Sequence, residues 1–326
     1  MIVSPCLTRT VVSEALTSGP ETYSATIVVV TKNRKEELRE ALRSATEQSG
    51  SVEVLVVDDG STDGTDEMVA REFPAVRLIR APESRGYIRQ RNFGAEQARS
   101  PIIVSIDDDA EFTSTDAVAT TLAEFDHPRI AAVAMPFIQE RRGDEVLQRA
   151  PSDEGTWVTN IYIGTAHAVR RDVFLALGGY DEDLEHLMEE ADYCLRLQRA
   201  GFVIRLGTAP PILHHESTSR NVVRDATYLS RNHALLAWLH LPFPYVLFRG
   251  VQVLGLVGWM SVRWRSPRSA LRGSASAIRY AVRNRERRAP MSRSAYRLVR
   301  SLRRHPMRLD EVEGSLPPLP AGRTMP

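Results

Sequence analysis

The sequence predicts an α/β fold with a doubly wound, mostly parallel sheet and helices on both of its faces. The first observation is a series of short runs rich in Val and Ile, which is typical of strands buried in a parallel sheet. The second is that helix-forming stretches separate these runs, so that each strand-and-helix unit has the length of a βαβ crossover. Ligands of such folds bind where the strands end, so candidate site residues are expected there.

The elements of the first half follow one another in a regular order. Strands are expected at residues 27–30, 54–57, 76–79 and 102–106, and the helices between them at 35–48, 66–72 and 88–99.

After residue 130 the pattern is less regular. A helix is expected at 184–199, because apolar residues recur there every four positions and Gly201 suits its C-terminal end. A further helix at 228–240 should end before Pro242. The apolar stretch at 245–262 follows.

Three consecutive carboxylates, Asp107, Asp108 and Asp109, follow an uncharged predicted strand. In an extended chain Asp107 and Asp109 project to the same side, because side chains alternate with a period of two. Carboxylates this close repel each other unless a cation lies between them. A hard divalent ion relieves that repulsion and can also hold a diphosphate, so this strand end predicts a metal site. A solvated acidic turn is the alternative.

A second acidic turn, residues 57–65, ends another predicted strand. Its Gly and Asp residues suit a tight turn, and Asp63 or Thr65 can cap the helix that follows. Alternatively, Asp58 or Asp59 accepts hydrogen bonds from a base N–H or a ribose hydroxyl at the ligand edge of the sheet.

Over residues 24–240 the chain resembles the family 2 glycosyltransferases, which have the GT-A fold. The likeness rests on motifs in the family's order: Thr31-Lys32-Asn33-Arg34, Asp58-Asp59-Gly60-Ser61-Thr62-Asp63-Gly64-Thr65, Ser84-Arg85-Gly86-Tyr87, Asp107-Asp108-Asp109, Gly178-Gly179-Tyr180-Asp181-Glu182 and Glu189-Glu190-Ala191-Asp192. The chain departs from the family at Gly164-Thr165-Ala166, where Gly-Gly-Asn is frequent.

The resemblance implies a donor site made of the first strand ends. Residues that would contact the base and ribose of a nucleotide sugar are Thr31, Asn33, Arg34, Asp58 and Asp59. Residues that would lie near its diphosphate, where a cation stabilises charge on the leaving group, are Arg85, Gly86 and Arg91.

The resemblance also implies a metal ion after the fourth strand. Asp109 would bind Mg²⁺ or Mn²⁺, while Asp107 and Asp108 would face the donor nucleotide, Asp107 also being a candidate ligand. His214 or His215 would be a further ligand, since the family often has a histidine in this place. A surface or acceptor-site histidine is the alternative.

Displacement at the anomeric carbon needs a base that takes the proton of the acceptor hydroxyl. The family places this base at the second acidic residue of the last motif, which is Glu190 here, where Asp is more usual. Glu189 and Asp192 are the other candidates, although the helix dipole alone favours acidic residues at a helix start. Family members act with inversion by direct displacement, which implies one base and no covalent intermediate.

The net charge of +1 conceals a segregation of charge along the chain. Residues 1–262 carry 26 basic and 37 acidic side chains, a net charge of −11, whereas residues 263–308 carry 15 Arg and only Glu286, a net charge of +14. An anionic membrane surface is the expected partner of the basic segment. Nucleic acid is unlikely as a partner, because no nucleic-acid motif or interleaved aromatic residues accompany the Arg residues.

Residues 245–262 are short for a membrane-spanning helix and contain Arg249. Together with Trp259 inside the stretch, the tryptophans and arginines beside it predict an amphipathic helix at a membrane interface; these are Trp238, Arg263, Trp264 and Arg265. Core packing or a spanning helix are the alternatives. Residues 1–22 lack the features of a secretory signal, and the only cysteines are Cys6 and Cys194, so a reducing cytoplasm is expected.

The expected organisation is an N-terminal extension, a GT-A domain whose halves bind donor and acceptor, a membrane-associating Arg-rich helical region and a disordered Pro-rich tail. Their ranges are 1–22, 23–240 (donor half 23–112, acceptor half 113–240), 241–308 and 309–326.

The predicted function is metal-dependent, inverting transfer of a hexosyl or deoxyhexosyl group from a nucleotide-diphosphate sugar to a hydroxyl acceptor. The acceptor is expected to be a glycan or a lipid-linked molecule, in cell-envelope, polysaccharide or glycolipid biosynthesis. The enzyme is expected to be peripheral, on the cytoplasmic face of the cell membrane. The alternative is a catalytically silent scaffold of the same fold that binds membrane or nucleic acid through its Arg-rich region.

Overall fold

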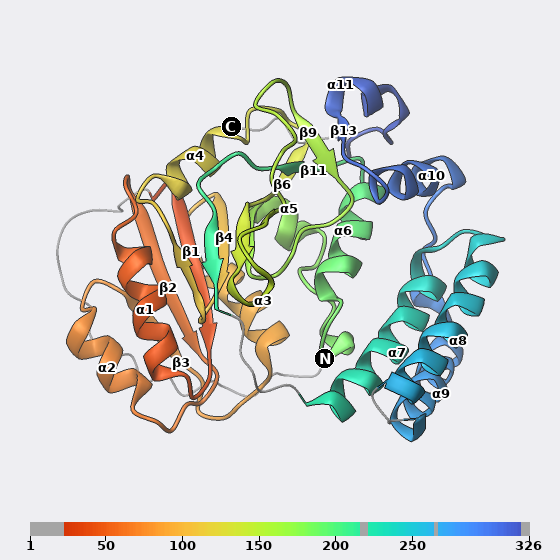
Figure 1. Cartoon of the computed structure of the whole chain (residues 1–326), viewed down its shortest axis with the longest axis horizontal. Helices are drawn as coiled ribbons and strands as arrows, with labels where there is room; N and C mark the ends of the chain where they lie inside the picture. The colour runs from red at the N-terminus through yellow and green to blue at the C-terminus, as the bar shows by residue number, and fades with distance from the viewer. Residues whose placement is uncertain (1–22, 216–220, 264–266, 321–326) are drawn as a thin grey trace, which may run out of the picture.

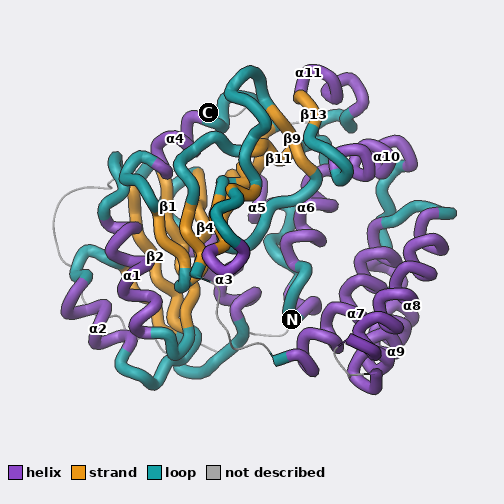
Figure 2. Tube along the Cα trace, in the orientation of Figure 1, coloured by secondary structure: helices purple, strands orange, loops and turns teal. Residues whose placement is uncertain are grey.

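The computed structural model describes residues 23–215, 221–263 and 267–320. It contains two sheets with helices packed around them, and a further group of helices at one end of the molecule (Figure 1, Figure 2). The α/β class expected from the sequence is confirmed. The extension at 1–22, with Cys6, lies outside the described residues, as do Trp264 and Arg265.

Four parallel strands form the half of the larger sheet that carries the predicted donor motifs. β1 (Ala25–Thr31) lies between β2 (Val52–Asp58) and β4 (Ile102–Asp107), and β3 (Arg77–Arg80) pairs with β2. The strand order therefore reverses beside β1, and the crevice at such a reversal is where open α/β sheets bind ligands. The connecting helices are α1 (Lys35–Thr46), α2 (Thr65–Glu72) and α3 (Tyr87–Gln97).

Alternate residues of β1 are buried on opposite faces of the sheet. Ile27 and Val29 belong to the same apolar cluster as Leu38 of α1, whereas Val28 belongs to the cluster that contains Ile88 of α3. This alternation follows from the period of two in a strand. Because both faces are covered, the strand sequences are continuous apolar runs, as expected for a buried parallel sheet.

The other half of the larger sheet mixes parallel and antiparallel strands. β10 (Ala166–Arg170) runs antiparallel to both β4 and β6 (Ile130–Ala134), and β11 (Val203–Leu206) runs parallel to β6. With β9 (Trp157–Thr159) and β13 (Met307–Arg308), the strand order is β13-β9-β11-β6-β10-β4-β1-β2-β3. Two short helices, α4 (Ala117–Ala123) and α5 (Arg171–Ala176), lie in its connections.

A smaller sheet begins immediately after the three aspartates. Its strands, in spatial order, are β5 (Ala110–Phe112), β12 (Ile212–His214), β7 (Phe137–Gln139) and β8 (Val146–Leu147). β12 pairs antiparallel with β5, so that His214 is opposite Ala110. This pairing brings a distant part of the chain to the aspartates.

The helix predicted at 184–199 begins later than expected, as α6 (Glu189–Arg199). Glu185, Leu187 and Met188 have positive φ angles of 61°, 66° and 71°, and these left-handed residues interrupt any helix before Glu189. The spacing of apolar residues predicted a helix here but not its buried face, because Leu187, Ala191 and Leu195 are only partly buried, and it carried no signal of the turn.

Three long helices form the group at one end of the molecule: α7 (Val222–His240), α8 (Tyr245–Arg263) and α9 (Pro267–Arg283). α7 begins earlier than the predicted 228–240, because the Asn221 side chain caps it by accepting a hydrogen bond of 3.0 Å from the Arg224 N–H. Both α8 and α9 pack on α7 and on each other. Among the described residues, none of the helices is long and apolar enough to span a membrane.

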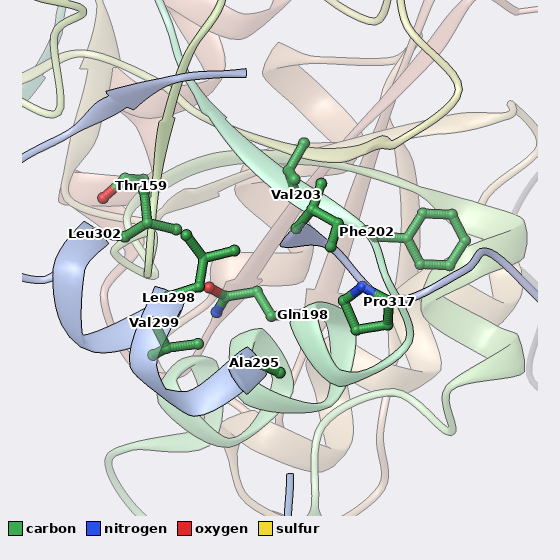
Figure 3. Close-up of a pocket in the computed structure, with 10 residues that line it drawn as sticks. Thr159, Gln198, Phe202, Val203, Ala295, Leu298, Val299, Leu302 and Pro317 are labelled. Carbon is green, nitrogen blue, oxygen red and sulfur yellow. The ribbon is translucent and has the colours of Figure 1, made fainter. Parts of the chain in front are cut away.

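The prediction of a disordered tail at 309–326 is wrong for residues 309–320. After α10 (Arg293–Leu302), β13 adds a strand to the sheet and leads into α11 (Leu309–Val312), whose Leu309 and Val312 are buried. Figure 3 shows Pro317 in the same pocket as Ala295 and Val299 of α10. The Pro-rich composition concealed the few apolar residues that anchor this segment. Residues 321–326 lie outside the described chain.

Candidate active site

The ends of β1, β2 and β4 lie side by side at one edge of the sheet. In the parallel register Thr31 is opposite Asp58, and Val30 is opposite Asp107. The residues that follow these strands in sequence therefore meet in space, as the predicted topology requires.

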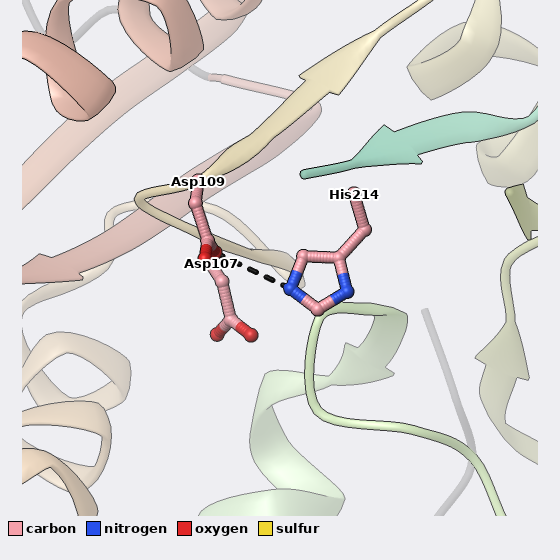
Figure 4. Close-up of side chains that lie close together, drawn as sticks. All are labelled: Asp107, Asp109 and His214. Carbon is pink, nitrogen blue, oxygen red and sulfur yellow. Dashed lines mark ion pairs between the residues drawn. The ribbon is translucent and has the colours of Figure 1, made fainter. Parts of the chain in front are cut away.

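Asp107, Asp109 and His214 form one cluster (Figure 4). One ligand atom from each lies within 4.8 Å of the others, so the expectation that both aspartates face one site is confirmed. His214 Nε2 is 3.3 Å from Asp109 Oδ1, and its buried Nδ1 has no hydrogen-bond partner in the described chain. Carboxylate oxygens suit Mg²⁺ and Mn²⁺, and His214 Nε2, the ring nitrogen that faces Asp109, is a further candidate donor. These residues fit a divalent cation.

His215 does not join this cluster. Its Nε2 lies 2.6 Å from Glu111 Oε1, and its Nδ1 lies 2.9 Å from Glu140 Oε2. Partial burial lowers the pKa of His215, but the hydrogen bonds to Glu140 and Glu111 outweigh burial and raise the pKa above its ordinary value. Successive residues of an extended chain point in opposite directions, so only His214 faces the aspartates.

Thr31 and Arg34 hold the aspartate turn. Thr31 Oγ1 donates a hydrogen bond of 2.8 Å to Asp108, and Arg34 contacts Asp108 and Asp109 at 3.0 and 2.8 Å. Burial raises the pKa of Asp108 to about 7 in spite of Arg34. Burial also opposes ionisation of Asp109, but His214 and Arg34 hold its pKa well below the ordinary range. Thr31 and Arg34 thus contact the carboxylates, whereas the resemblance implied contacts with a nucleotide.

The Asp59 carboxylate is fully used inside the protein. It accepts hydrogen bonds from Ser84 Oγ (2.6 Å), the Arg85 N–H (2.7 Å), the Gly86 N–H (3.1 Å) and Gln90 Nε2 (2.7 Å). Because four donors surround its two oxygens, Asp59 shapes the loop that leads into α3 in this structure and offers a ligand no open acceptor geometry.

Asn33 and Asp58 shape the second acidic turn. The Asn33 N–H donates to Ser61 Oγ at 2.9 Å, and Asn33 Oδ1 accepts from the Thr62 N–H at 2.7 Å. Asp58 Oδ1 accepts from the Ser61 N–H at 2.8 Å, while its buried Oδ2 has no hydrogen-bond partner among the described residues. Asp58 is therefore the acidic residue of this turn whose second oxygen has no hydrogen bond, although that oxygen lies 3.6 Å from Arg80 Nε in an ion pair.

Arg91 joins the aspartates to the start of α6. Its guanidinium lies 2.6 Å from Asp107 Oδ1, 2.9 Å from Glu189 Oε1 and 3.1 Å from Glu190 Oε1. Only 12% of its side chain is exposed, so these charge-assisted contacts are shielded from water. Three carboxylates around one guanidinium fix the position of Glu190 relative to Asp107.

The two glutamates of α6 differ in accessibility. Glu189 is 2% exposed and also accepts a hydrogen bond of 3.0 Å from the Tyr87 hydroxyl, whereas Glu190 is 18% exposed. Burial, and then the charge of Glu190, raise the pKa of Glu189. The backbone of Gly164 passes so close that a Cβ there would overlap the Glu190 carboxylate and the Arg91 guanidinium. Glycine at this position leaves the space that both side chains occupy.

Asp192, the third catalytic candidate, is not part of the Arg91 network. Its carboxylate is 2.6 Å from His240 Nε2 and 2.7 Å from Arg196, and its side chain is 1% exposed. Burial opposes ionisation, but His240 and Arg196 hold the pKa of Asp192 below its ordinary value. Asp192 joins α6 to α7, which is a structural role.

Arg85 and Gly86 lie on a separate cleft of about 310 Å³ beside the start of α3. Arg89, Arg224 and Tyr228 line the same cleft. Glu182 and Glu185 line it as well, and Arg89 pairs with Glu182 at 3.2 Å, so the expectation that a diphosphate lies near Arg85 stays a prediction.

Sequence reasoning missed Tyr87 and Asn232 as residues that position the site. The buried Asn232 side chain donates to three carbonyl oxygens of the turn before α6, those of Leu184, His186 and Leu187, at 3.1, 2.9 and 2.9 Å. Tyr87 lies within a motif named above, but Asn232 has no sequence signal, because α7 carries several other polar residues.

The chain was compared with known protein families and structures. Residues 26–178 match the family model described as glycosyl transferase family 2. A pre-mycofactocin glycosyltransferase of Mycobacterium tuberculosis is 25% identical over 243 residues, covering 68% of this chain and 49% of that protein. The N-acetylglucosaminyl-diphospho-decaprenol L-rhamnosyltransferase of the same organism is 27% identical over 237 residues, covering 59% and 75%. This chain thus spans about half the length of the first of these relatives.

A solved structure shares the fold. The mannosyltransferase PcManGT from Pyrobaculum calidifontis, in complex with GDP-Man and Mn²⁺, aligns with a TM-score of 0.55 at 23% identity. The alignment covers 88% of this chain and 81% of that one.

Proposed function

Because residues 26–178 match the model of glycosyl transferase family 2 and the chain shares the fold of solved glycosyltransferases, we propose that this protein transfers a sugar from a nucleotide-diphosphate sugar to a hydroxyl acceptor. The observation that carries the proposal is the link from Asp109 and Asp107 through Arg91 to Glu190. It joins a candidate metal site to a partly exposed carboxylate, the two functions that such a transfer needs.

In the proposed reaction Asp107, Asp109 and His214 would hold Mg²⁺ or Mn²⁺. When bound, this ion supplies positive charge to the diphosphate of the donor. Arg34 supports Asp108 and Asp109 by the contacts described above, and Arg85 lies on the cleft at the start of α3. Asp58, whose Oδ2 has no hydrogen bond and pairs with Arg80 at 3.6 Å, is the acidic residue proposed to meet the nucleoside.

Glu190 is proposed as the base. Its carboxylate is more exposed than that of Glu189, which is committed to both Arg91 and Tyr87. Glu190 would take the proton of the acceptor hydroxyl while that oxygen attacks the anomeric carbon and the nucleoside diphosphate leaves. One base and one displacement give inversion at this carbon.

The relatives suggest the class of pathway. One is named as a rhamnosyltransferase that acts on a decaprenol-linked diphospho-sugar, and another as an O-antigen chain rhamnosyltransferase. We therefore place this protein in the biosynthesis of a cell-envelope polysaccharide or glycolipid, with hexosyl or deoxyhexosyl transfer to a glycan or lipid-linked hydroxyl.

Binding of a panel of nucleotide sugars, measured by calorimetry with and without Mn²⁺, tests the metal and donor together. We expect one donor class to bind in a Mn²⁺-dependent manner, and Asp109→Ala to remove that dependence. Asp126→Ala is the control, because Asp126 is exposed and forms only a surface pair with Arg205. Full metal-dependent binding and transfer by the Asp109→Ala variant would contradict the proposal.

A further inference from the structure

The outer side of α8 is apolar along its whole length. The large side chains on it are exposed by 59% to 82% and are Leu247, Phe248, Val251, Leu254 and Val262. The inner side of the same helix is also apolar, because Val253, Val257 and Met260 are buried in a cluster with residues of α7 and α9. Since the inner side alone supplies the packing, the outer side is a second apolar surface that the described chain leaves open to solvent.

The outer side of α9 combines an apolar stripe with a basic one. Leu271, Ile278 and Val282 are exposed by 60%, 65% and 71%. Four exposed arginines lie beside this apolar stripe: Arg268, Arg272, Arg279 and Arg283. Their spacings of four and seven residues place them on one side of the helix. None of these four forms an ion pair with a carboxylate of the described residues.

The two outer sides belong to one surface. α8 and α9 each pack on α7 and on each other, so the sides that face away from α7 lie next to each other (Figure 1). We call this surface the α8–α9 face and define it by Leu247, Val251, Leu254, Leu271, Ile278 and the four arginines of α9.

The charge of this face and the length of its helices indicate the kind of partner that binds it. The face carries the four exposed arginines of α9, and residues 241–285 contain no Asp or Glu, so the face complements an anionic partner. An apolar surface bordered by arginine is the pattern of helices that lie in the plane of an anionic lipid surface. No described helix can span a bilayer, so the helices would lie on it. We propose that the α8–α9 face binds the surface of an anionic phospholipid bilayer, with the apolar side chains entering the headgroup region.

The face is connected to the proposed catalytic turn through α7. Asn232 lies on the helix against which α8 and α9 pack, and it holds the turn that precedes Glu189. A protein held by this face therefore keeps its site close to acceptors that reside in the bilayer. Membrane binding itself does not depend on the proposed transferase activity, so the two can fail separately.

Flotation of the full chain with vesicles tests the proposal. We expect binding to phosphatidylcholine vesicles that contain phosphatidylglycerol, much weaker binding to pure phosphatidylcholine, and weakening by salt. The double variant Val251→Glu with Leu254→Glu should lose binding to both kinds of vesicle. Arg272→Gln with Arg279→Gln should bind anionic vesicles about 30-fold more weakly, which corresponds to about 2 kcal/mol.

The matched control is Arg43→Gln with Arg71→Gln, which removes two exposed charges from α1 and α2 and should leave vesicle binding unchanged. Circular dichroism and thermal unfolding verify that each variant is folded. Equal binding of wild type and the Val251→Glu, Leu254→Glu variant would overturn the proposal, and so would equal binding to neutral and anionic vesicles. A wild-type dimer that this variant converts to monomer, without vesicle binding, would assign the face to self-association instead.

Discussion

At the scale of single residues, Arg91 determines how the site is assembled. One guanidinium contacts Asp107 of β4 and both glutamates of α6, and it does so in a shielded position. A guanidinium is suited to this because its planar set of donors serves several carboxylate oxygens at once, which a lysine ammonium does not reproduce. The positive charge of Arg91 thereby offsets the repulsion among these three carboxylates.

The roles of Glu189 and Glu190 can be separated by substitution. Glu190→Gln should reduce kcat by roughly 100- to 10,000-fold, the usual contribution of a general base, with little change in donor affinity. The measurement is single-turnover transfer together with calorimetry of the donor. Glu47→Gln, at an exposed position after α1, is the control. Retention of kcat in Glu190→Gln, together with its loss in Glu189→Gln, would assign the base to Glu189.

His167 should make the stability depend on pH. Its ring stacks on Tyr162 and contacts the Tyr180 hydroxyl at 2.9 Å, and burial, followed by the charge of Arg91, lowers its pKa to about 3. Between about pH 6.5 and pH 3 the unfolded chain binds a proton at this residue that the folded chain lacks. The free energy of unfolding therefore falls as the pH falls through this window, by up to about 1.4 kcal/mol per pH unit.

Urea unfolding of wild type and His167→Gln at neutral and mildly acidic pH isolates this contribution, since other titrating groups are common to both proteins. His167→Gln should be less stable at neutral pH but should lose less stability on acidification. Identical losses in the two proteins would show that His167 is not the cause.

At the scale of elements, the turn between residues 185 and 188 sets the start of α6. Three of its residues have positive φ angles, and none of the three is glycine. The surrounding structure therefore holds them in a backbone conformation that such residues disfavour. The Asn232 side chain supplies much of what holds it, through three carbonyl groups. A helix of the C-terminal group thus determines the position of Glu189 and Glu190.

Asn232→Leu should therefore lower kcat by at least about tenfold, because buried carbonyl groups left without donors cost roughly 1–3 kcal/mol each and the turn would move. Donor binding should change little, since the aspartates lie on β4 and the turn after it. Ser230→Ala is the control: Ser230 is buried on the same helix but donates to Ala270. It should lower thermal stability without lowering kcat. Equal kcat losses in both variants would mean that α7 as a whole, rather than Asn232, matters.

At the scale of the whole molecule, the C-terminal segment completes the fold. β13 pairs with β9 at the edge of the larger sheet, and Arg129 donates to the carbonyl of Pro317 at 3.0 Å. The chain therefore returns from helices α7, α8 and α9 to the sheet. The acidic part of the chain (1–262) and the Arg-rich segment (263–308) are thus connected by packing as well as by the backbone.

Leu309→Ala tests this return. Leu309 is 6% exposed in the main apolar cluster, so its truncation should lower the free energy of unfolding by about 2–5 kcal/mol in urea. Val223→Ala, at a residue that is 58% exposed, is the control and should change stability by less than about 0.5 kcal/mol. A disordered tail would instead leave Leu309→Ala as stable as the control.

The sequence by itself determined the parallel half of the sheet and the segments that meet at its edge, because strand period, crossover length and turn residues are local properties. It also singled out Asp107, Asp109, Glu189 and Glu190.

Tertiary structure alone decided that His214 rather than His215 joins the aspartates, and that Asp192 pairs with His240 instead of facing the site. It likewise decided that residues 309–320 are ordered. Each of these depends on contacts between residues far apart in the chain, such as the pairing of β5 with β12, and no local pattern encodes them.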